Sequence, residues 1–561
     1  MKIDLSVNGK LDNNHLDIYR KFYSETKDVY VKLIEDVSSR NIKNTSWWFS
    51  APSSRHIDSS HIHHYLASLL FLEHISKSYN ELEIIVETNE YKKIIEKYFK
   101  HKKIKKIFVK NNVLINKVKN IFKILLILIE NISYLIISSI LKKKSKIDSE
   151  LNLIHYDIHS DSDINHDRYF HFNKHILSIE KWNDIKYVIL PRYVDFNILK
   201  YIKFINKINI SKNRCLLFES VLSLTDYIYI FYKSIFPRKI IINNYKDFKY
   251  DISNLIIEEI KILKSPRPTF NAYAYSRFVK KLSKKSTISR MILWYENYIP
   301  EKGLLLGLNK YSSNTLSKGY QGFAPQNYLL NLFITNNEKK AKLTPNIISY
   351  ISRKNINFIN QYVTEQKYEI APALRYEEVF KQIKIQDSSD VKQCFIYAPY
   401  DKEETIDILK LVIKFNKDNR SNRNKIIFNI KFHPGGPIKF VNIYKSIIGD
   451  SNINLINSLS NVTLSNCDLV ITGPSSVCFE SIAMGKYVMI YDRRIGSFRN
   501  IIASDVSNNL YCIFNNFNDL NNNLNNFIGN KNKVSEAEKK KIRLEYFEEV
   551  NKSGLRNFFY F

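Results

Sequence analysis

The fold is decided by residues 468–492, which read DLVITGPSSVCFESIAMGKYVMIYD. An apolar run at 469–471 ends in the turn residues Thr472-Gly473-Pro474, and a serine pair follows where a helix should begin. Gly485 closes that helix, and a second apolar run follows at 487–491. Short apolar runs that alternate with helical segments are typical of parallel strands in an α/β sheet.

The start of this helix is suited to binding an anion. A helix start leaves backbone N–H groups unpaired and carries the positive end of the helix dipole. Ser475 and Ser476 lie there, and their hydroxyls can donate to a phosphate. Glu480, about one turn further on, can accept hydrogen bonds from sugar hydroxyls. The alternative is that Ser475 is only an N-cap and Glu480 a solvated helix residue.

A second strand end lies at residues 431–436, which read KFHPGG. Ligand groups in open α/β sheets collect at the carboxyl ends of strands. We therefore expect His433, Pro434 and Gly435 to join the serine pair in a nucleotide site, with His433 also in a catalytic role.

The N-terminal half supplies candidates for the other side of the site. A strand-like run ends at Glu296, whose carboxylate suits proton transfer, although a purely structural carboxylate remains the alternative. Residues 319–322, GYQG, read as a turn that brings Tyr320 and Gln321 to a ligand. A strand-like run at 44–49 leads into Ser53-Ser54-Arg55, expected to bind an acceptor or a sugar carboxylate. A capped helix with a surface arginine is the alternative.

Composition bounds the class of protein. The chain has 561 residues, enough for two or more domains, and a net charge of +30 from 85 basic and 55 acidic residues. No zinc-finger spacing or aromatic RNP-type strand is present, which argues against nucleic acid. The five cysteines are scattered and indicate buried thiols in the cytoplasm. The histidines between 155 and 175 are irregularly spaced, so we expect a polar loop and no metal site.

Residues 111–145 interrupt the α/β pattern. The segment 124–141 is mostly apolar and has lysines on both sides, at 117, 119, 123 and 142–144. It is short for a membrane span and carries Glu130 and Asn131 near its middle. A helix that lies in the membrane interface is expected, with a buried core helix and a true span as alternatives.

Several of these motifs resemble known glycosyltransferases. The helix from Glu480 resembles the segment with which GT-B enzymes hold a nucleotide sugar, although Tyr487 stands in place of the usual Pro. The first Glu of the common two-Glu motif would fall at Thr472. The ordered motifs at 294–297, 301–303, 319–321 and 371–376, together with Ser53-Ser54-Arg55, resemble a family of bacterial surface-carbohydrate transferases that add Kdo-type sugars to O-antigen and capsule.

The resemblance implies an α/β GT-B fold, with two Rossmann-like domains facing a central cleft. Residues 1–375 would bind the acceptor and carry the helical insertion near 111–145, and residues 376–561 would bind the donor. The donor would be a CMP-activated ulosonic acid, most readily Kdo, used as a substrate without a metal or a cofactor. The acceptor would be a lipid-linked glycan, and the protein would sit peripherally on the inner face of the cytoplasmic membrane.

Within this reading His433 supports the leaving CMP, Glu480 holds the ribose, and Glu296 activates the acceptor hydroxyl. Three alternatives remain open. One is a teichoic-acid phosphotransferase that uses CDP-glycerol or CDP-ribitol and would need a second histidine from the N-terminal half, for which His155, His171 and His175 are available. Another is a transferase of sialic or another nonulosonic acid, and the third is a non-catalytic nucleotide-binding protein.

Overall fold

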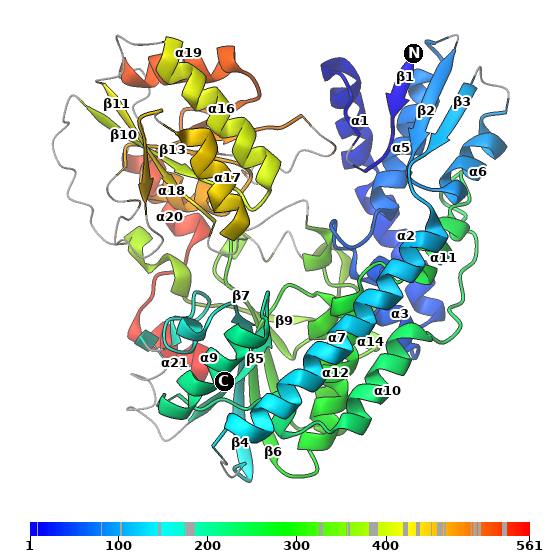
Figure 1. The fold of residues 1–561 in the computed structure, drawn as a ribbon, viewed down its shortest axis with the longest axis vertical. Coiled ribbons are helices and arrows are strands. Elements are labelled where there is room, and N and C mark those ends of the chain that lie inside the picture. The colour runs from blue at the N-terminus through cyan, green and yellow to red at the C-terminus, as the bar shows by residue number, and fades with distance from the viewer. Residues whose placement is uncertain are drawn as a thin grey trace.

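The protein was analysed as a computed structural model (Figure 1). It describes the whole chain except residues 8, 80, 101–103, 144–146, 173, 176–185, 212, 325–328, 355, 357–359, 381–390, 419–424, 434–437, 450, 457–463, 465–466, 495, 497–501, 503–505, 530–535 and 561. The described strands form three parallel sheets, one of three strands and two of six. We refer to the parts built on these sheets as the N-terminal, middle and C-terminal lobes.

The N-terminal lobe, blue in Figure 1, has a sheet in the order β1-β2-β3. Its strands are β1 (Lys2–Asp4), β2 (Leu82–Val86) and β3 (Ile104–Val109). Its helices are α1 (Asn13–Glu25), α2 (Lys27–Arg40), α3 (Thr45–Trp48), α4 (Ala51–Ser54), α5 (Ile62–Ile75) and α6 (Asn89–Tyr98). The long helix α7 (Val113–Leu141) leads from this lobe to the middle lobe.

The middle lobe has a sheet in the order β5-β4-β6-β7-β8-β9. Its strands are β4 (Glu150–Ile158), β5 (Tyr187–Tyr193), β6 (Thr287–Trp294), β7 (Leu316–Gln321), β8 (Ile347–Tyr350) and β9 (Lys367–Ile370). Its helices are η1 (Asp161–Ile164), α9 (Ile198–Ile210), η2 (Phe218–Ser220), α10 (Leu224–Ile235), α11 (Ser253–Lys261), α12 (Pro266–Leu282), α13 (Ile299–Tyr311), η3 (Leu330–Leu332), α14 (Asn336–Lys340), η4 (Asn360–Tyr362) and η5 (Leu374–Phe380).

The C-terminal lobe has a sheet in the order β12-β11-β10-β13-β14-β15. Its strands are β10 (Lys392–Tyr397), β11 (Ile426–Lys431), β12 (Ile453–Ile456), β13 (Leu469–Thr472), β14 (Tyr487–Tyr491) and β15 (Tyr511–Phe514). Its helices are α16 (Lys402–Asp418), α17 (Ile438–Ile448), α18 (Val477–Ala483), α19 (Phe517–Ile528) and α20 (Glu536–Tyr546). The last helix, α21 (Lys552–Phe559), returns to the middle lobe.

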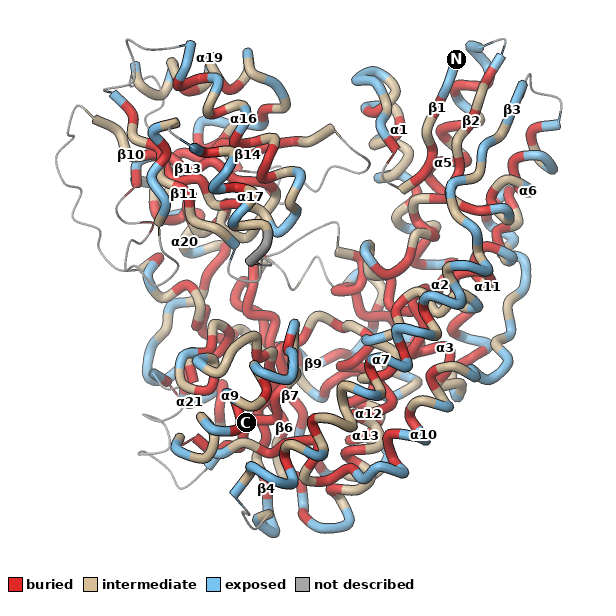
Figure 2. The backbone as a smooth tube through the Cα atoms, viewed as in Figure 1, coloured by how far each residue is buried: buried red, intermediate tan, exposed pale blue. Residues whose placement is uncertain are grey.

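The strands at the centre of the C-terminal sheet are buried along their whole length. Every residue of β13 and of β14 is buried, as expected for parallel strands covered by helices on both faces. Their near-continuous apolar sequence therefore follows from their position at the centre of the sheet. Residues 468–492 fold as the strand, turn, helix and strand that the sequence predicts. Figure 2 shows this buried centre in red beneath the exposed segments of the lobe.

Both six-stranded sheets are doubly wound. In each of them the order in which successive strands are added changes direction beside the strand that comes first in the chain. In the C-terminal sheet the reversal lies between β10 and β13, and in the middle sheet it lies between β4 and β6. Open α/β sheets bind ligands outside the carboxyl ends of the strands at such a switch point. The α/β fold class with two Rossmann-like domains, predicted from the sequence, is confirmed by this topology.

The chain joins the lobes in two further ways. Helix α21 packs on the middle sheet, where Lys318 Nζ donates to Phe558 O at 2.9 Å and Tyr187 Oη donates to Phe559 O. On the other side, Arg20 of α1 makes two hydrogen bonds to Asp492 after β14, at 2.7 and 2.8 Å. The N-terminal lobe thus contacts the C-terminal lobe directly.

The structure corrects two local interpretations. Residues 44–49 form helix α3 and its flanks, where a strand was expected, because Asn44 accepts from the Ser46 N–H and caps a helical turn. Residues 319–321 belong to strand β7 and do not form a turn. Residues 1–375 also carry two sheets, and the predicted boundary at 375/376 falls between β9 and β10.

Candidate active site between the middle and C-terminal sheets

The candidate site lies where the carboxyl ends of the two six-stranded sheets meet. From the middle lobe, β4 leads to His159 and β6 leads to Glu296. From the C-terminal lobe, β11 leads to His433 and β13 leads to Ser475 and Ser476. All four strands lie at or beside a switch point, so the topology brings the predicted residues of both halves to one region.

Glu296 is fixed at the end of β6 by its neighbours. The Trp294 indole N–H donates to Glu296 Oε1 at 2.8 Å, and Asn331 Nδ2 donates to the Glu296 carbonyl at 2.6 Å. The Glu296 N–H donates to Glu301 Oε2 at 2.8 Å. The carboxylate is half-buried and held in one orientation, as a general base requires.

Behind Glu296 lies a second carboxyl group, Glu301, at the start of α13. It is 1% exposed, and burial raises its pKa to about 8 even though Arg192 favours the charged form. Arg192 Nη1 lies 3.6 Å from Glu301 Oε1, and Arg192 Nη2 donates to Asp157 at 2.7 Å. Arg192 therefore lies between Glu301 and Asp157, while burial favours the protonated form of Glu301.

The opposite wall is built around Glu480 and Arg375. Burial raises the pKa of Glu480 to about 7, against the opposing effect of Arg375 and Lys431. The Arg375 guanidinium carbon lies 5.9 Å from the centre of the Trp294 ring in the middle lobe, and its charge acts on Glu480 of the C-terminal lobe, so this side chain lies between the two lobes. Arg375, Lys431 and Glu480 therefore form a mixed charge cluster at the meeting of the two sheets.

His433 faces basic groups of the middle lobe. Its ring packs edge-on against Tyr400, with the centroids 5.4 Å apart. Loss of hydration, together with the nearby charges of Arg168, His159 and Arg375, lowers the pKa of His433 to about 4. His433 is therefore neutral at pH 7 and can donate one hydrogen bond to a ligand oxygen.

The serine pair lies before α18, at the end of β13. The Cys478 N–H donates to the Ser475 carbonyl at 3.0 Å, and the half-buried Ser476 precedes the first residue of the helix without a side-chain capping bond. Pro434 and Gly435, predicted to join these serines, lie outside the described residues.

The structure gives Ser53, Ser54 and Arg55 a role different from the predicted one. Arg55 is 1% exposed, and its Nη2 donates to Glu338 at 2.9 Å and to Phe333 O at 2.6 Å. The Ser53 and Ser54 hydroxyls are buried and donate to the carbonyls of Trp48 and Ala51, at 3.0 and 2.7 Å. These residues fasten α4 to the middle lobe, and Arg55 has no accessible surface with which to bind a sugar carboxylate.

Tyr320 and Gln321 are both fully buried at the end of β7. The Tyr320 hydroxyl donates to Pro372 O at 2.8 Å and accepts from the Leu374 N–H at 3.1 Å, so it positions the segment that carries Arg375. The Gln321 amide makes no hydrogen bond to any described residue. A buried amide without partners is costly, but Gln321 has no more accessible surface than Arg55, so its predicted contact with a ligand is not seen in this structure.

Several residues of the site were not singled out from the sequence. Arg375 was noted only as part of a motif, and Arg168, His159 and Glu301 were given no role. Arg168 follows the end of β4 by ten residues and Arg375 follows the end of β9 by five, so neither is marked by a position at a strand end. The local signal for Glu301 is only its place as the N3 capping residue of α13, which accepts from the Tyr298 N–H, whereas its burial depends on packing against Arg192 of β5.

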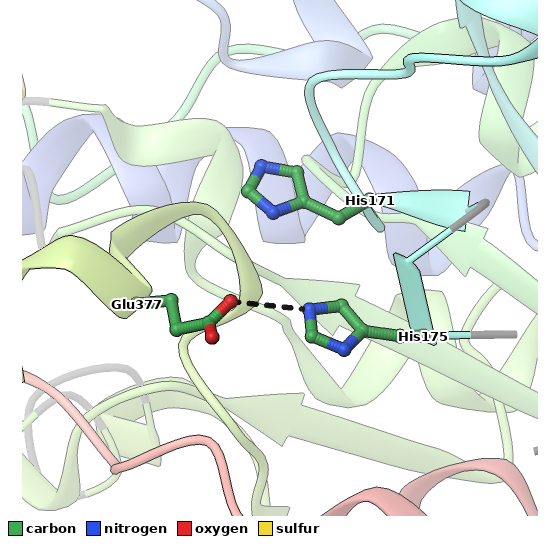
Figure 3. A group of neighbouring side chains, drawn as sticks. All are labelled: His171, His175 and Glu377. Atoms are coloured by element: carbon green, nitrogen blue, oxygen red, sulfur yellow. Dashed lines mark ion pairs between the residues drawn. The ribbon is translucent and has the colours of Figure 1, made fainter. Parts of the chain in front are cut away.

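The segment expected to be a polar loop brings two histidines together with a carboxylate (Figure 3). His171, His175 and Glu377 have ligand atoms within 4.8 Å of one another, and His175 Nε2 lies 3.6 Å from Glu377 Oε2. Lys174 also pairs with Glu377. His155, by contrast, is buried and hydrogen-bonded to Leu190 O at 2.8 Å.

No family model matches the chain, and no curated protein matches it. Similar solved structures include a protein assigned as a UDP-N-acetylglucosamine 2-epimerase from Listeria monocytogenes, at 11% identity and a TM-score of 0.41, covering 73% of this chain and 95% of that one. The wall teichoic acid polymerase TagF is 10% identical, with a TM-score of 0.40 and coverage of 78% and 96%. OtsA is 10% identical, with a TM-score of 0.39 and coverage of 71% and 94%. These similarities are too remote to indicate an activity.

Proposed function

We propose that the protein is a glycosyltransferase that moves a sugar from a nucleotide-activated donor to an acceptor hydroxyl at the meeting of the two sheets. The observation that carries the proposal is the position of Glu296. This oriented carboxylate lies at the end of β6, beside the switch point of the middle sheet, and the C-terminal lobe carries His433 after β11 and the serine pair and Glu480 after β13. A base on one wall and phosphate-binding groups on the other are what such a transfer needs.

The donor we propose is a CMP-activated ulosonic acid, with Kdo as the leading candidate. Its phosphate would lie near Lys431, Arg375 and Arg168, with hydrogen bonds from Ser475, Ser476 and His433. Glu480 would accept from the ribose hydroxyls. Loss of a CMP monoanion leaves less charge to stabilise than loss of a diphosphate, so no metal ion at the phosphate is invoked.

The carboxylate of the donor sugar needs a cationic partner other than Arg55, which is neutralised by Glu338. Arg375 and Arg168 both lie near His433, and guanidinium groups bind carboxylates with paired hydrogen bonds. On the acceptor side Glu296 takes the hydroxyl proton.

We further propose that the acceptor is a lipid-linked glycan and that the protein works on the inner face of the cytoplasmic membrane. Helix α7 is long and apolar enough to cross a bilayer, but one of its faces packs against the middle lobe. On that face Asn120 Nδ2 donates to Ile262 O at 2.8 Å, and Arg267 pairs with Glu130 at 2.6 Å. These contacts would be lost in a span, which favours a helix lying in the interface.

The outer face of α7 carries an apolar stripe at helical spacing. Its exposed residues are Leu114, Val118, Phe122, Leu125, Leu126, Ile129, Ile136 and Ile140. Helix α10, which packs against α7, adds Leu224, Ile228, Tyr229 and Tyr232, and Phe236 follows directly after α10. We call these residues the apolar face. Lysines 117, 119, 123, 142 and 143 lie on the same helix or directly after it, and this combination suits an anionic bilayer. Helices α7 and α10 can be followed in Figure 1, and Figure 2 marks their exposed segments in pale blue.

One observation favours a second candidate, a phosphotransferase that uses CDP-glycerol or CDP-ribitol. Such an enzyme would need a histidine from the N-terminal half close to His433, and His159 lies near enough to depress the pKa of His433. His159 itself has its pKa lowered by burial and by Arg168, with opposing effects of the neighbouring aspartates.

A donor assay separates the two candidates. The purified protein is incubated with CMP-Kdo, CMP-sialic acid, CDP-glycerol and CDP-ribitol in the presence of lipid-linked glycan, and released CMP is measured. We expect CMP-Kdo to be consumed and Glu296→Gln to reduce the rate at least 100-fold. Consumption of CDP-glycerol or CDP-ribitol alone, with loss of activity in His159→Ala, would replace the first candidate by the second.

A further inference from the structure

His171, His175 and Glu377 converge from two separate segments (Figure 3). The two histidines lie one helical turn apart, since the His175 N–H donates to His171 O at 3.1 Å, and their rings are nearly parallel with centroids 5.9 Å apart. Glu377 comes from η5, about 200 residues later in the chain. We propose that these three side chains bind a divalent transition-metal ion of the zinc type.

The backbone around His171 is held in an unusual conformation that presents its side chain. Its φ angle is +47°, in the left-handed region that non-glycine residues rarely adopt. The Asp167 carboxylate fixes the preceding turn by accepting from the N–H groups of Tyr169, Phe170 and Phe172 at 2.9, 2.6 and 2.5 Å. Such strain is usually retained where a side chain must point in one direction.

The ligand set selects the class of ion. Two imidazoles and one carboxylate suit Zn²⁺ and its first-row neighbours, whereas Ca²⁺ and Mg²⁺ prefer oxygen ligands throughout. A tetrahedral zinc ion at about 2.1 Å from each ligand would hold the ligand atoms about 3.4 Å apart. The three ligand atoms now lie within 4.8 Å of one another, so small side-chain rotations would close the site.

Lys174 pairs with the same carboxylate but does not prevent binding. The Lys174 side chain is 52% exposed, and ion pairs at exposed positions are weak compared with the coordination of a metal ion. The ion would therefore displace the ammonium group, which can turn into solvent.

The ion would connect two segments of the candidate active site. The segment that carries His171 also carries Arg168 and Tyr169, and η5 carries Arg375. The ion would fix these basic side chains relative to one another without taking part in the transfer itself. This role is independent of the proposed function.

The test is a titration of the purified, chelator-treated full-length protein with Co²⁺, whose visible bands report tetrahedral coordination, followed by displacement with Zn²⁺. We expect one ion per chain, and at least tenfold weaker binding in both His171→Ala and Glu377→Gln. His166→Ala, an exposed histidine nearby, is the matched control and should bind like the wild type.

Lys174→Ala distinguishes a metal site from an ion pair, because removal of the competing ammonium should leave metal binding as tight or tighter. Absence of Co²⁺ binding to the wild type, or unchanged binding in His171→Ala and Glu377→Gln, would overturn the proposal.

Discussion

At the scale of single residues, the most constrained charge in the described chain is Glu338. It is fully buried, accepts from Lys302 at 2.7 Å and from Arg55 at 2.9 Å, and these cations hold its pKa at about 2 despite the opposing effect of burial. Glu338→Gln would leave two buried cations without their counter-charge. We expect a loss of about 3–5 kcal/mol in the free energy of unfolding, measured by urea denaturation.

An exposed ion pair provides the control for this measurement. Glu81 lies 3.8 Å from Lys105, and both side chains are more than 60% exposed. Glu81→Gln should change the free energy of unfolding by less than about 0.5 kcal/mol. A Glu338→Gln protein as stable as Glu81→Gln would show that the buried cluster does not hold α4 to the middle lobe.

Glu301 makes the stability of the protein depend on pH. Its folded pKa, about 8, lies above the ordinary value of 4.5, so the folded state holds this proton more tightly than the unfolded state does. The stabilisation is complete below pH 4.5 and is lost as the pH rises through about 8. Glu301→Gln, which still accepts from the Glu296 N–H, should remove this contribution.

The measurement is urea denaturation of both proteins between pH 5 and pH 9. We expect the difference in stability, wild type minus variant, to fall by several kcal/mol across this range, since one pKa unit corresponds to about 1.4 kcal/mol. A difference that stays constant with pH would mean that Glu301 is ionised in the folded protein.

At the scale of elements, the strand, turn and helix at 468–492 could be predicted because the pattern is local. The apolar runs become β13 and β14, and the serine pair precedes α18. The role of Arg55 could not be predicted, because its partner Glu338 lies 283 residues away. The same holds for β1, a strand of only three residues that is paired with β2 some 80 residues later.

The apolar face of α7 and α10 gives a prediction for membrane binding. Phe122→Ser and Ile136→Ser replace residues that are 58% and 53% exposed, so folding should be little affected. Each substitution removes part of an apolar side chain whose full burial in the membrane would contribute about 1.5–3 kcal/mol to the free energy of binding. Together they should weaken binding to vesicles that contain phosphatidylglycerol at least tenfold.

Vesicle sedimentation at low and high salt provides the measurement. Leu544→Ser, at an exposed leucine of α20, is the control and should bind like the wild type. Binding of the wild type should decrease with salt because the flanking lysines contribute electrostatic attraction. Equal sedimentation of the wild type and the double variant would exclude the apolar face as the membrane contact.

At the scale of the whole molecule, the sequence predicted two Rossmann-like units and the structure contains them, with an additional three-stranded lobe at the N-terminus. The candidate site arises from the way the two larger sheets face each other. His433, Ser475 and Glu480 are close in the chain and were found from local patterns. Arg375 joins them through the packing of the lobes, and Glu301 is buried by packing within the middle lobe against Arg192, which no local pattern reports.

The central claim is that this site binds the nucleotide of a CMP-activated donor. Calorimetric titration of the full-length protein with CMP, CDP, UDP and GDP, with and without Mg²⁺, tests it most directly. CMP should bind most tightly and independently of Mg²⁺. Arg375→Ala should weaken binding about 10–100-fold through the lost charge-assisted contact, whereas Arg214→Ala, at an exposed arginine paired with Asp148, should not. Tighter binding of UDP or GDP, or equal CMP affinity in Arg375→Ala, would contradict the account.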